Sequence, residues 1–210
     1  MSRFGVFQAL VPPLCVVCRS NCDRAMSLCP RCMGELNRAP AIRRSPPPGV
    51  TGVVSCAPHE GVARALLVRF KFGRLTGLAP LIAGYMADQI VSGAPDLLMV
   101  PVPPAPGRRL WRGFDPAGEL AAEIVRGNPG WRLAGDLLVR SDPGSQRGRG
   151  RATRLAAPPS IEPSGVFTAV RAVTLVDDVL TTGATLAACA AALARAGSGP
   201  VSAVTFTRRL

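Results

Sequence analysis

Residues 173–185, with the sequence VTLVDDVLTTGAT, constrain the fold of this chain more than any other stretch. They begin with four apolar or β-branched residues, which is typical of a buried strand. Two adjacent carboxylates, Asp177 and Asp178, follow, and a turn rich in threonine comes next. Apolar residues then recur at helical spacing as far as Gly197. We therefore expect a strand at 173–176, acidic residues at its end, a turn, and a helix that stops at Gly197.

This order of elements suits a sugar phosphate. The start of a helix offers main-chain N–H groups and the positive end of the helix dipole, and both bind phosphate. Gly183 lets the main chain approach that phosphate closely. Neighbouring strand residues point to opposite sides, so Asp177 and Asp178 should diverge, and one or both could accept hydrogen bonds from two sugar hydroxyls. The phosphate turn consists of Thr181, Thr182, Gly183, Ala184 and Thr185. The alternative is an ordinary strand–turn–helix unit, which any α/β protein can contain.

Strand and helix patterns alternate along the rest of the chain. Further strands are predicted at 50–56, 97–102, 137–139 and 201–206, and helices at 61–71, 78–91 and from Pro116, with Asp115 as the N-cap. From about residue 97 the alternation predicts an α/β fold with a mainly parallel sheet flanked by helices.

Two pairs of cysteines stand near the N-terminus. Each pair has the spacing C-x2-C, and ten residues separate the pairs, so four thiolates can surround one zinc ion. The four residues are Cys15, Cys18, Cys29 and Cys32. Disulfides are the alternative, but the chain shows no secretion signal. Cys22 lies between the pairs and could compete as a ligand, whereas Cys56 and Cys189 are expected to be buried apolar residues.

Basic residues gather in a Pro- and Arg-rich loop after the strand at 97–102. Arg108, Arg109 and Arg112 lie there, where the planar guanidinium suits diphosphate oxygens. The alternative is a surface loop in an arginine-rich protein. Lys71 could also reach a diphosphate, or it is a solvated lysine at the end of the helix at 61–71.

The chain as a whole resembles the ComF family of phosphoribosyltransferase-like proteins, also called GntX-like or double zinc ribbon proteins. The resemblance rests on the cysteine pairs, on Pro101-Val102-Pro103 with Arg112-Gly113-Phe114, on Gln146, and on the stretch 176–185. Family members usually have Asn-Gln after Arg-Gly-Phe, whereas this chain has Asp115-Pro116. The resemblance implies a type I phosphoribosyltransferase-like fold, with a zinc ribbon at 1–38, a linker at 39–49 and the transferase-like domain at 50–210.

The resemblance also implies a function. The ligand would be 5-phosphoribosyl diphosphate with Mg²⁺, Asp177 and Asp178 would be the catalytic residues, and the loop at 108–113 would hold the diphosphate. A long loop at 141–165 would close over the site. The family is linked to DNA uptake in competence, and no motif indicates the acceptor. Two hypotheses follow: a phosphoribosyltransferase, or a non-catalytic module that binds the nucleotide sugar and takes part in DNA processing.

Composition sets the remaining bounds. The net charge of +12 favours polyanions, so we expect weak, electrostatic binding of single-stranded DNA or contact with DNA-processing proteins. The hydrophobic content of 48% supports a packed core. No apolar run is long enough to cross a bilayer, and the N-terminal stretch lacks the features of a signal peptide, so we expect a cytoplasmic protein with no membrane insertion.

Overall fold

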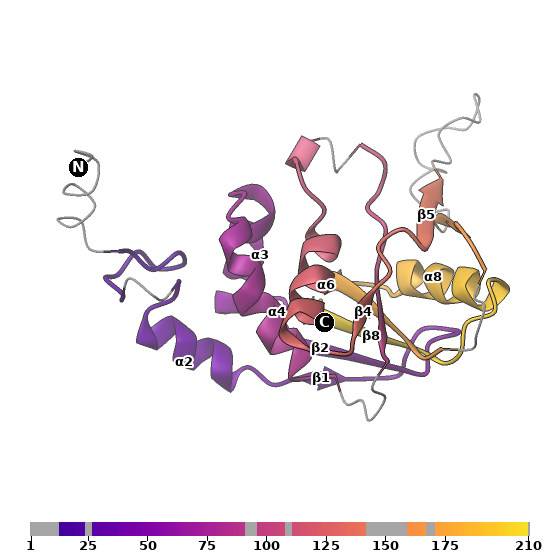
Figure 1. Cartoon of the computed structure of the whole chain (residues 1–210). Helices are drawn as coiled ribbons and strands as arrows, with labels where there is room; N and C mark the ends of the chain where they lie inside the picture. Colours follow the sequence, from indigo (N-terminus) through magenta and orange to yellow (C-terminus); the bar gives the residue numbers. More distant parts are fainter. Residues whose placement is uncertain are drawn as a thin grey trace, which may run out of the picture.

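The computed structural model describes residues 13–23, 27–90, 96–107, 111–141, 159–166 and 171–209. Within them, a six-stranded and mostly parallel sheet forms the centre of the molecule, as the alternation of strands and helices predicts (Figure 1). Its strands are β1 (Ile42–Arg43), β2 (Gly52–Pro58), β3 (Leu98–Pro101), β4 (Arg132–Leu133), β7 (Val173–Leu180) and β8 (Val201–Arg208). Only β1 runs antiparallel to its neighbour.

Five α-helices and one 3-10 turn accompany the sheet in the described residues. They are α2 (Pro30–Arg38), α3 (Gly61–Phe72), η1 (Thr76–Leu78), α4 (Ala79–Ala87), α6 (Pro116–Gly127) and α8 (Ala184–Arg195). The predicted cap of α6 is confirmed, because the Asp115 carboxylate accepts a hydrogen bond from the main-chain N–H of Ala117 at 3.1 Å. The helix predicted at 78–91 is shorter and begins with the η1 turn.

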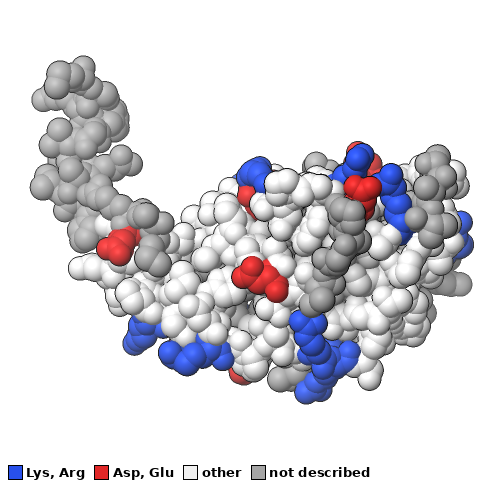
Figure 2. Space-filling model, turned by 60° about the horizontal axis from the view of Figure 1, so that its bottom comes forward, with Lys and Arg blue, Asp and Glu red and all other residues white. Residues whose placement is uncertain are grey.

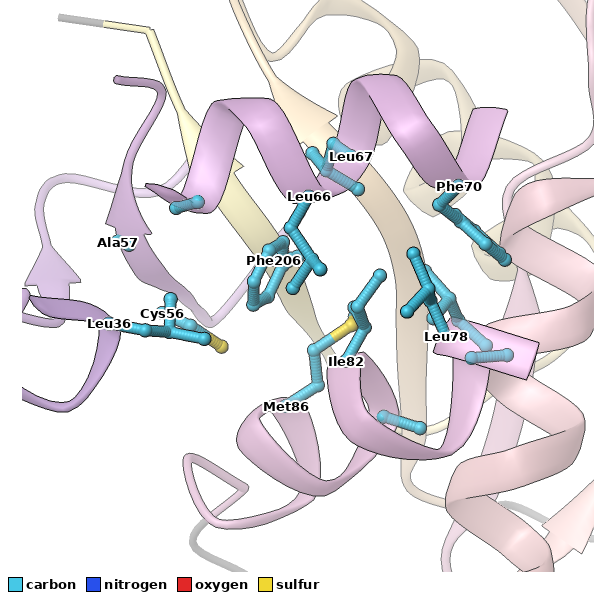
Figure 3. Close-up of a cluster of buried hydrophobic side chains, with 14 of the residues drawn as sticks. Leu36, Cys56, Ala57, Leu66, Leu67, Phe70, Leu78, Ile82, Met86 and Phe206 are labelled. Atoms are coloured by element: carbon cyan, nitrogen blue, oxygen red, sulfur yellow. The ribbon is translucent and has the colours of Figure 1, made fainter. Parts of the chain in front are cut away.

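The core lies on both faces of the sheet. On one face, α3, α4 and α6 pack over alternate residues of the strands, including Val176 and Phe206. Figure 3 shows Leu66 of α3 and Ile82 of α4 directed toward Phe206. On the other face, α8 covers a second cluster that contains Leu175. Because successive side chains of β7 point to opposite faces of the sheet, they are divided between the two helix layers.

The strand order places a switch of direction in the middle of the sheet. The order is β1-β2-β8-β7-β3-β4. From β3 the chain moves outward to β4, and from β7 it moves outward in the opposite direction to β8. Open α/β sheets bind ligands in the crevice beyond the carboxyl ends of two such strands. A ligand site is therefore expected at the carboxyl ends of β3 and β7.

Several elements differ from the sequence predictions, and among them β6 (Ser160–Pro163) lies in the stretch 141–165 that was predicted as a loop. The stretch 137–139 is a strand, but β5 (Leu138–Ser141) pairs with β6 (Ser160–Pro163) in a separate antiparallel ribbon. Three apolar residues cannot indicate which sheet a strand joins. β4 was not predicted, since two exposed residues carry no periodic signal. The stretch 39–49, predicted as a linker, contains the edge strand β1.

Candidate functional site

A cleft of about 960 Å³ opens at the carboxyl ends of β3 and β7. Its walls come from α3, from the loop after β3, from the start of α6, from β5 and from β7 and the turn that follows it. Of the seven residues predicted to bind the sugar phosphate, Asp177, Asp178, Thr181 and Thr185 line it together, whereas Thr182, Gly183 and Ala184 do not. Lys71 and Arg112, predicted as diphosphate ligands, line the same cleft. Arg108 and Arg109 lie outside the described residues.

The cleft exists because β7 continues past the end of β3. The last pairing between them joins Pro101 to Val176, and the N–H of Val102 then bonds to the Val176 carbonyl at 2.9 Å. Pro103 and Pro104 follow, and neither has an N–H to continue the ladder. β7 nevertheless extends to Leu180 through its pairing with β8. The sequence predicted that the two aspartates follow the strand. They lie instead inside β7, in the part that no longer pairs with β3.

Asp177 compensates for this lost neighbour. By alternation, the N–H of Asp178 lies on the same side of β7 as the Val176 carbonyl, where β3 no longer runs. The Asp177 carboxylate accepts that N–H at 2.8 Å. Burial, and then the adjacent Asp178 carboxylate, hold the pKa of Asp177 well above its usual value, although the bond from Asp178 and the charge of Lys71 oppose the rise. Asp177 thus tends to retain a proton.

Asp178 points to the other side of the sheet, toward α3. Its carboxylate forms an ion pair of 2.5 Å with the ammonium of Lys71, and both side chains are largely buried. Lys71 is therefore not a solvated lysine at a helix end, which was one reading of the sequence. Its position depends on α3, because Phe70 beside it is fully buried in the core. The two aspartates diverge, and only Asp178 has a cationic partner among the described contacts.

The turn after β7 leads directly into α8. Gly183 is the N-cap, with a left-handed φ of 82°, which glycine adopts readily. A Cβ at this position would lie 2.7 Å from the Pro47 side chain. Gly183 is thus required by its own backbone and by Pro47, so a bulkier residue would disturb folding as well as any ligand. Thr182 and Ala184 are exposed beside it, and the Thr182 hydroxyl accepts a hydrogen bond from the Ala184 N–H at 3.4 Å.

Three further basic residues line the cleft, and the sequence pattern did not indicate that they lie near it. Arg64 of α3, Arg140 of β5 and Arg209 after β8 all line it, together with Lys71 and Arg112. These five side chains outnumber the three carboxylates of the lining, Asp115, Asp177 and Asp178. The cleft therefore favours an anionic ligand. Nothing local marks Arg140 or Arg209, since only the tertiary fold brings them to this edge.

His59, the single histidine of the sequence, also lines this cleft. It lies just after β2, and its Nδ1 shares a hydrogen bond of 2.8 Å with the Thr207 hydroxyl of β8. Burial, and then the charges of Arg209, Lys71 and Arg64, lower the pKa of the imidazole. His59 is therefore neutral near pH 7 and can donate or accept a hydrogen bond. Because His59 belongs to no recognised motif, the sequence did not indicate that it lies in the cleft.

The second site is the cysteine cluster. The sulfur atoms of the four predicted cysteines lie within 4.8 Å of one another, and those of Cys18 and Cys29 are 3.5 Å apart. A tetrahedral zinc–thiolate shell has sulfurs about 3.8 Å apart, so small shifts of the sulfur atoms complete it. Cys22 is outside this group, with its sulfur directed to the Pro13 carbonyl at 3.6 Å. The buried state of Cys56 and Cys189 is confirmed, and burial raises the pKa of each thiol to about 12.

The chemistry of the four thiols suits a cation. Hydrogen bonds from Ser20 are the main cause that lowers the pKa of Cys18 to about 5. Burial, followed by the neighbouring sulfurs, raises the pKa of Cys32 to about 12. Four thiolates cannot coexist at this spacing without a positive charge among them. Cys29 precedes α2 and Cys32 lies in its first turn, so this half of the cluster is held by a helix rather than by a β-ribbon.

The cysteine region is attached firmly to the sheet domain. Cys15, Cys29, Cys32 and Leu36 belong to the same core cluster as α3 and α4. Glu35 of α2 accepts a hydrogen bond of 3.1 Å from the N–H of Val62, in the first turn of α3. This carboxylate caps α3 in place of a local residue, because the N-cap Glu60 makes no side-chain cap bond. One end of α3 thus contacts the cysteine region and the other end carries Lys71 into the cleft.

No protein-family model matches the chain, and no curated protein that was compared with it matches either. The structure itself shows an α/β protein with a mostly parallel six-stranded sheet and, in the described residues, a four-cysteine cluster able to bind a metal. Among the described residues, no helix combines the length and the apolar character that a membrane span requires.

Proposed function

We propose that this chain binds 5-phosphoribosyl diphosphate with Mg²⁺ and transfers the phosphoribosyl group to an acceptor. The observation that carries the proposal is the shared cleft: the acidic pair, Thr181 and Thr185 of the turn into α8, and five basic side chains line one cavity. A ligand with vicinal hydroxyls, a terminal phosphate and a diphosphate requires these three kinds of partner together. The resemblance to ComF-type phosphoribosyltransferases agrees with this assignment and adds a link to competence.

The residues of the cleft divide the ligand between them. The start of α8, with Thr181 and Thr185, would hold the 5-phosphate through main-chain N–H groups and hydroxyls. Asp178 would accept hydrogen bonds from the ribose hydroxyls once Lys71 turns to the diphosphate, and Asp177, in its protonated form, would donate a hydrogen bond to a ribose hydroxyl. Arg112, with Arg108 and Arg109 of the same loop, would bind the departing diphosphate.

The transfer step needs no covalent intermediate on the protein. The acceptor lone pair forms a bond to the anomeric carbon while the bond from that carbon to the diphosphate oxygen breaks. The diphosphate leaves with the electron pair, and the proton lost by the acceptor passes to it or to solvent. Mg²⁺, when bound with the ligand, neutralises diphosphate charge. The Asp178 carboxylate and the basic wall supply the electrostatic stabilisation of this charge separation.

The metal of the cysteine cluster would have a structural role. We assign zinc to it, since four thiolates whose sulfurs lie within 4.8 Å of one another can complete a tetrahedral shell with no open position for a substrate. Such a metal stabilises the short segment around it, which has little core of its own. Zinc would then fix α2, and with it the Glu35 contact to α3.

A second function, DNA processing without catalysis, is favoured by the net charge of +12. On the face drawn in Figure 2, however, the Lys and Arg residues that the structure describes stand in separate groups, some of them beside acidic residues. The basic residues of the cleft favour a small anion instead. Affinity for single-stranded DNA should therefore be weak and fall steeply with added salt. Tight binding that is insensitive to salt, measured by fluorescence anisotropy, would favour the DNA-processing function.

Calorimetric titration with phosphoribosyl diphosphate and Mg²⁺ tests the main proposal. We expect saturable binding by the wild-type protein, and diphosphate release when the correct acceptor is added from a panel. Ribose 5-phosphate should bind more weakly, because it lacks the group that the basic wall recognises. Absence of affinity for either ligand would contradict the proposal. Binding without diphosphate release for any acceptor would leave the non-catalytic alternative.

A further inference from the structure

One face of α3 forms a wall of the cleft and carries a cation at each end. Arg64, Leu67, Val68 and Lys71 line the cavity, with the spacing i, i+3, i+4 and i+7 of a single helix face. The two cations are seven residues apart, which corresponds to about 10 Å along the helix axis. The two residues between them are apolar. The wall therefore has two positively charged ends separated by an apolar strip.

The two ends of α3 lie against different parts of the sheet. Gly61, its first residue, comes shortly after β2, whereas Phe72, its last residue, contacts Trp111 in the loop after β3, with 6.0 Å between the ring centroids. β8 and β7 lie between β2 and β3 in the sheet. Neighbouring strands are about 4.8 Å apart, so β2 and β3 are separated by about 14 Å. A diphosphate held by the loop after β3 therefore does not reach the β2 end of the cleft.

Three segments converge at the β2 end. The N–H of His59 donates to the Arg208 carbonyl at 2.7 Å, and the N–H of Arg209 donates to the Leu180 carbonyl at 2.9 Å. These bonds fix the main chain of both residues at the edge of the sheet. Arg64 lies in the first turn of α3, directly after these strand ends. The side chains of His59, Arg64 and Arg209 all line the cavity.

The two arginines at this end have no acidic partner. Among the described residues, no carboxylate forms an ion pair with Arg64 or Arg209, and both arginines are exposed. The nearby Asp178 is already paired with Lys71. Glu60, at the start of α3, lines a separate cavity of about 220 Å³ between α2 and α3. The two guanidinium groups are therefore available to an anionic ligand, which they can bind through charged hydrogen bonds.

His59 is suited to join the two arginines. Its Nδ1 shares a hydrogen bond of 2.8 Å with the hydroxyl of Thr207, which is fully buried, so the imidazole ring is held in one orientation. When Nδ1 accepts the hydroxyl proton, the neutral ring carries its own proton on Nε2. No group of the described residues is hydrogen-bonded to Nε2. His59 can thus donate one hydrogen bond to a ligand in the cleft.

We propose that Arg64, Arg209 and His59 form a second oxyanion subsite at the carboxyl ends of β2 and β8, which binds a phosphate or carboxylate group. This group is additional to the phosphates of the phosphoribosyl ligand. The inference rests on the proposed function only where it assigns the Lys71 end of the cleft to the diphosphate. Two sources of such a group share this chemistry, namely an acid group of the acceptor and a free inorganic anion.

The chain itself provides a reporter for this subsite. His59 is its single histidine, so the imidazole signals in an NMR spectrum belong to His59 alone. Burial, and then the charges of Arg209, Lys71 and Arg64, lower the pKa of His59, and the charge of Asp178 opposes them. An anion held beside the ring favours the imidazolium and therefore raises the pKa. The probe is inorganic phosphate, added to the full chain without Mg²⁺.

We expect phosphate to shift the His59 signals saturably and to raise the pKa of His59. The affinity measured in this way should fall about 10-fold or more in the variant with Arg64→Gln and Arg209→Gln, the range for hydrogen bonds to charged groups. The same variant should show a raised His59 pKa without phosphate, because two of the charges that lower it are gone.

A matched control variant carries Arg126→Gln and Arg132→Gln, which remove two exposed guanidinium groups outside the cleft. It should bind phosphate at His59 as the wild-type protein does. Equal affinity in the two double variants, or no response of His59 to phosphate in the wild-type protein, would overturn the inference.

A second titration separates the subsite from the proposed function. With saturating phosphoribosyl diphosphate and Mg²⁺ present, phosphate should still shift the His59 signals. Loss of this response would overturn the inference, because the three residues would then belong to the phosphoribosyl site. If phosphoribosyl diphosphate does not bind, but phosphate shifts His59 and the variant with Arg64→Gln and Arg209→Gln loses the response, the proposed function fails and the subsite stands.

Diphosphate release distinguishes the two sources of the oxyanion. The probes are 4-aminobenzoate and 4-aminobenzamide, which offer the same kind of amine to phosphoribosyl diphosphate, although only the first carries a carboxylate. Faster release with the acid than with the amide, lost in the variant with Arg64→Gln and Arg209→Gln, would assign the subsite to an acidic acceptor. Equal release, or none, together with phosphate binding at His59, would assign it to a free inorganic anion.

Discussion

The cysteine cluster and the sheet-edge cleft are built in opposite ways. All four cysteines come from one short stretch, residues 15–32, and a turn and a helix bring their sulfurs together. The cleft draws its lining from residues as far apart as His59 and Arg209. Local geometry therefore fixes the first site, whereas the second depends on sheet order, on the end of β3 and on the position of α3. A motif can specify the first kind of site completely and the second only in part.

The two regions still meet along one helix. Glu35 caps the start of α3, and Lys71 near its end pairs with Asp178. Variants that damage one region therefore measure how far the other depends on it.

The largest effect should follow loss of the metal ligands. Cys29→Ser with Cys32→Ser should abolish metal binding, since two of four thiolates are gone, and should unfold residues 13–38 locally. Metal analysis should find about one zinc per wild-type chain and none in the variant. Hydrogen exchange should show faster exchange in α2. Cys56→Ser is the control, because Cys56 is buried outside the cluster. Full zinc retention by the double variant would contradict the assignment.

The next effect concerns the acidic pair. Asp178→Asn removes the partner of Lys71 and a charged acceptor, so affinity for phosphoribosyl diphosphate should fall about 10- to 100-fold, the range for hydrogen bonds to charged groups. Asp177→Asn should be milder, since the amide oxygen can still accept the Asp178 N–H. Titration calorimetry measures both, and zinc content should stay unchanged. If the variant with both substitutions binds like wild type, the roles given to the pair are wrong.

A smaller effect should depend on pH. Because the pKa of Asp177 is raised in the folded protein above its ordinary value of 3.8, the folded state prefers the protonated form. The stability that this provides is present at low pH and is lost as pH rises through the raised pKa. Asp177→Asn does not titrate, so its Tm should gain on that of wild type as pH increases, without divalent cations. A Tm difference that is constant across the pH range would contradict the raised pKa.

The smallest effect should come from the junction itself. Glu35→Ala removes the cap of α3 and should cost about 1 kcal/mol of unfolding free energy, as lost N-caps typically do. Glu35→Gln keeps an oxygen acceptor and should cost less. Glu60→Ala is the matched control, since Glu60 makes no side-chain cap bond at the same helix end. Urea unfolding measures all three. Equal stability of Glu35→Ala and wild type would show that the two regions are joined by packing alone.

The sequence predicted the main features of the fold because they are periodic or local. These features depend on residues that are neighbours in the chain. They are the strand and helix on either side of the turn at 181–185, the Asp115 cap and the four-cysteine cluster. The end of β7 was placed too early, because Asp177 and Asp178 are poor strand formers that only the pairing with β8 keeps extended.

The parts of the site that could not be predicted are the long-range ones. Pro47 fills the space that a side chain at position 183 would need, although the two residues are far apart in the sequence. Arg140, Arg209 and His59 reach the cleft from three different strands or strand ends, and no spacing rule connects them. The distinct surroundings of the two aspartates also follow from tertiary structure, since the sequence presents them as equivalent neighbours.

The prolines after β3 have a consequence for solubility as well as for the cleft. By stopping β3, Pro103 and Pro104 leave β7 with an open edge inside a sheet, and open edges attract foreign strands and promote aggregation. The Asp177 carboxylate occupies the first free N–H of this edge, and the paired charges of Asp178 and Lys71 lie beside it. An incoming strand would have to displace the Asp177 carboxylate and desolvate the ion pair of Asp178 and Lys71. The carboxylates proposed to bind a sugar would thus also protect this open edge of β7 from pairing with a foreign strand.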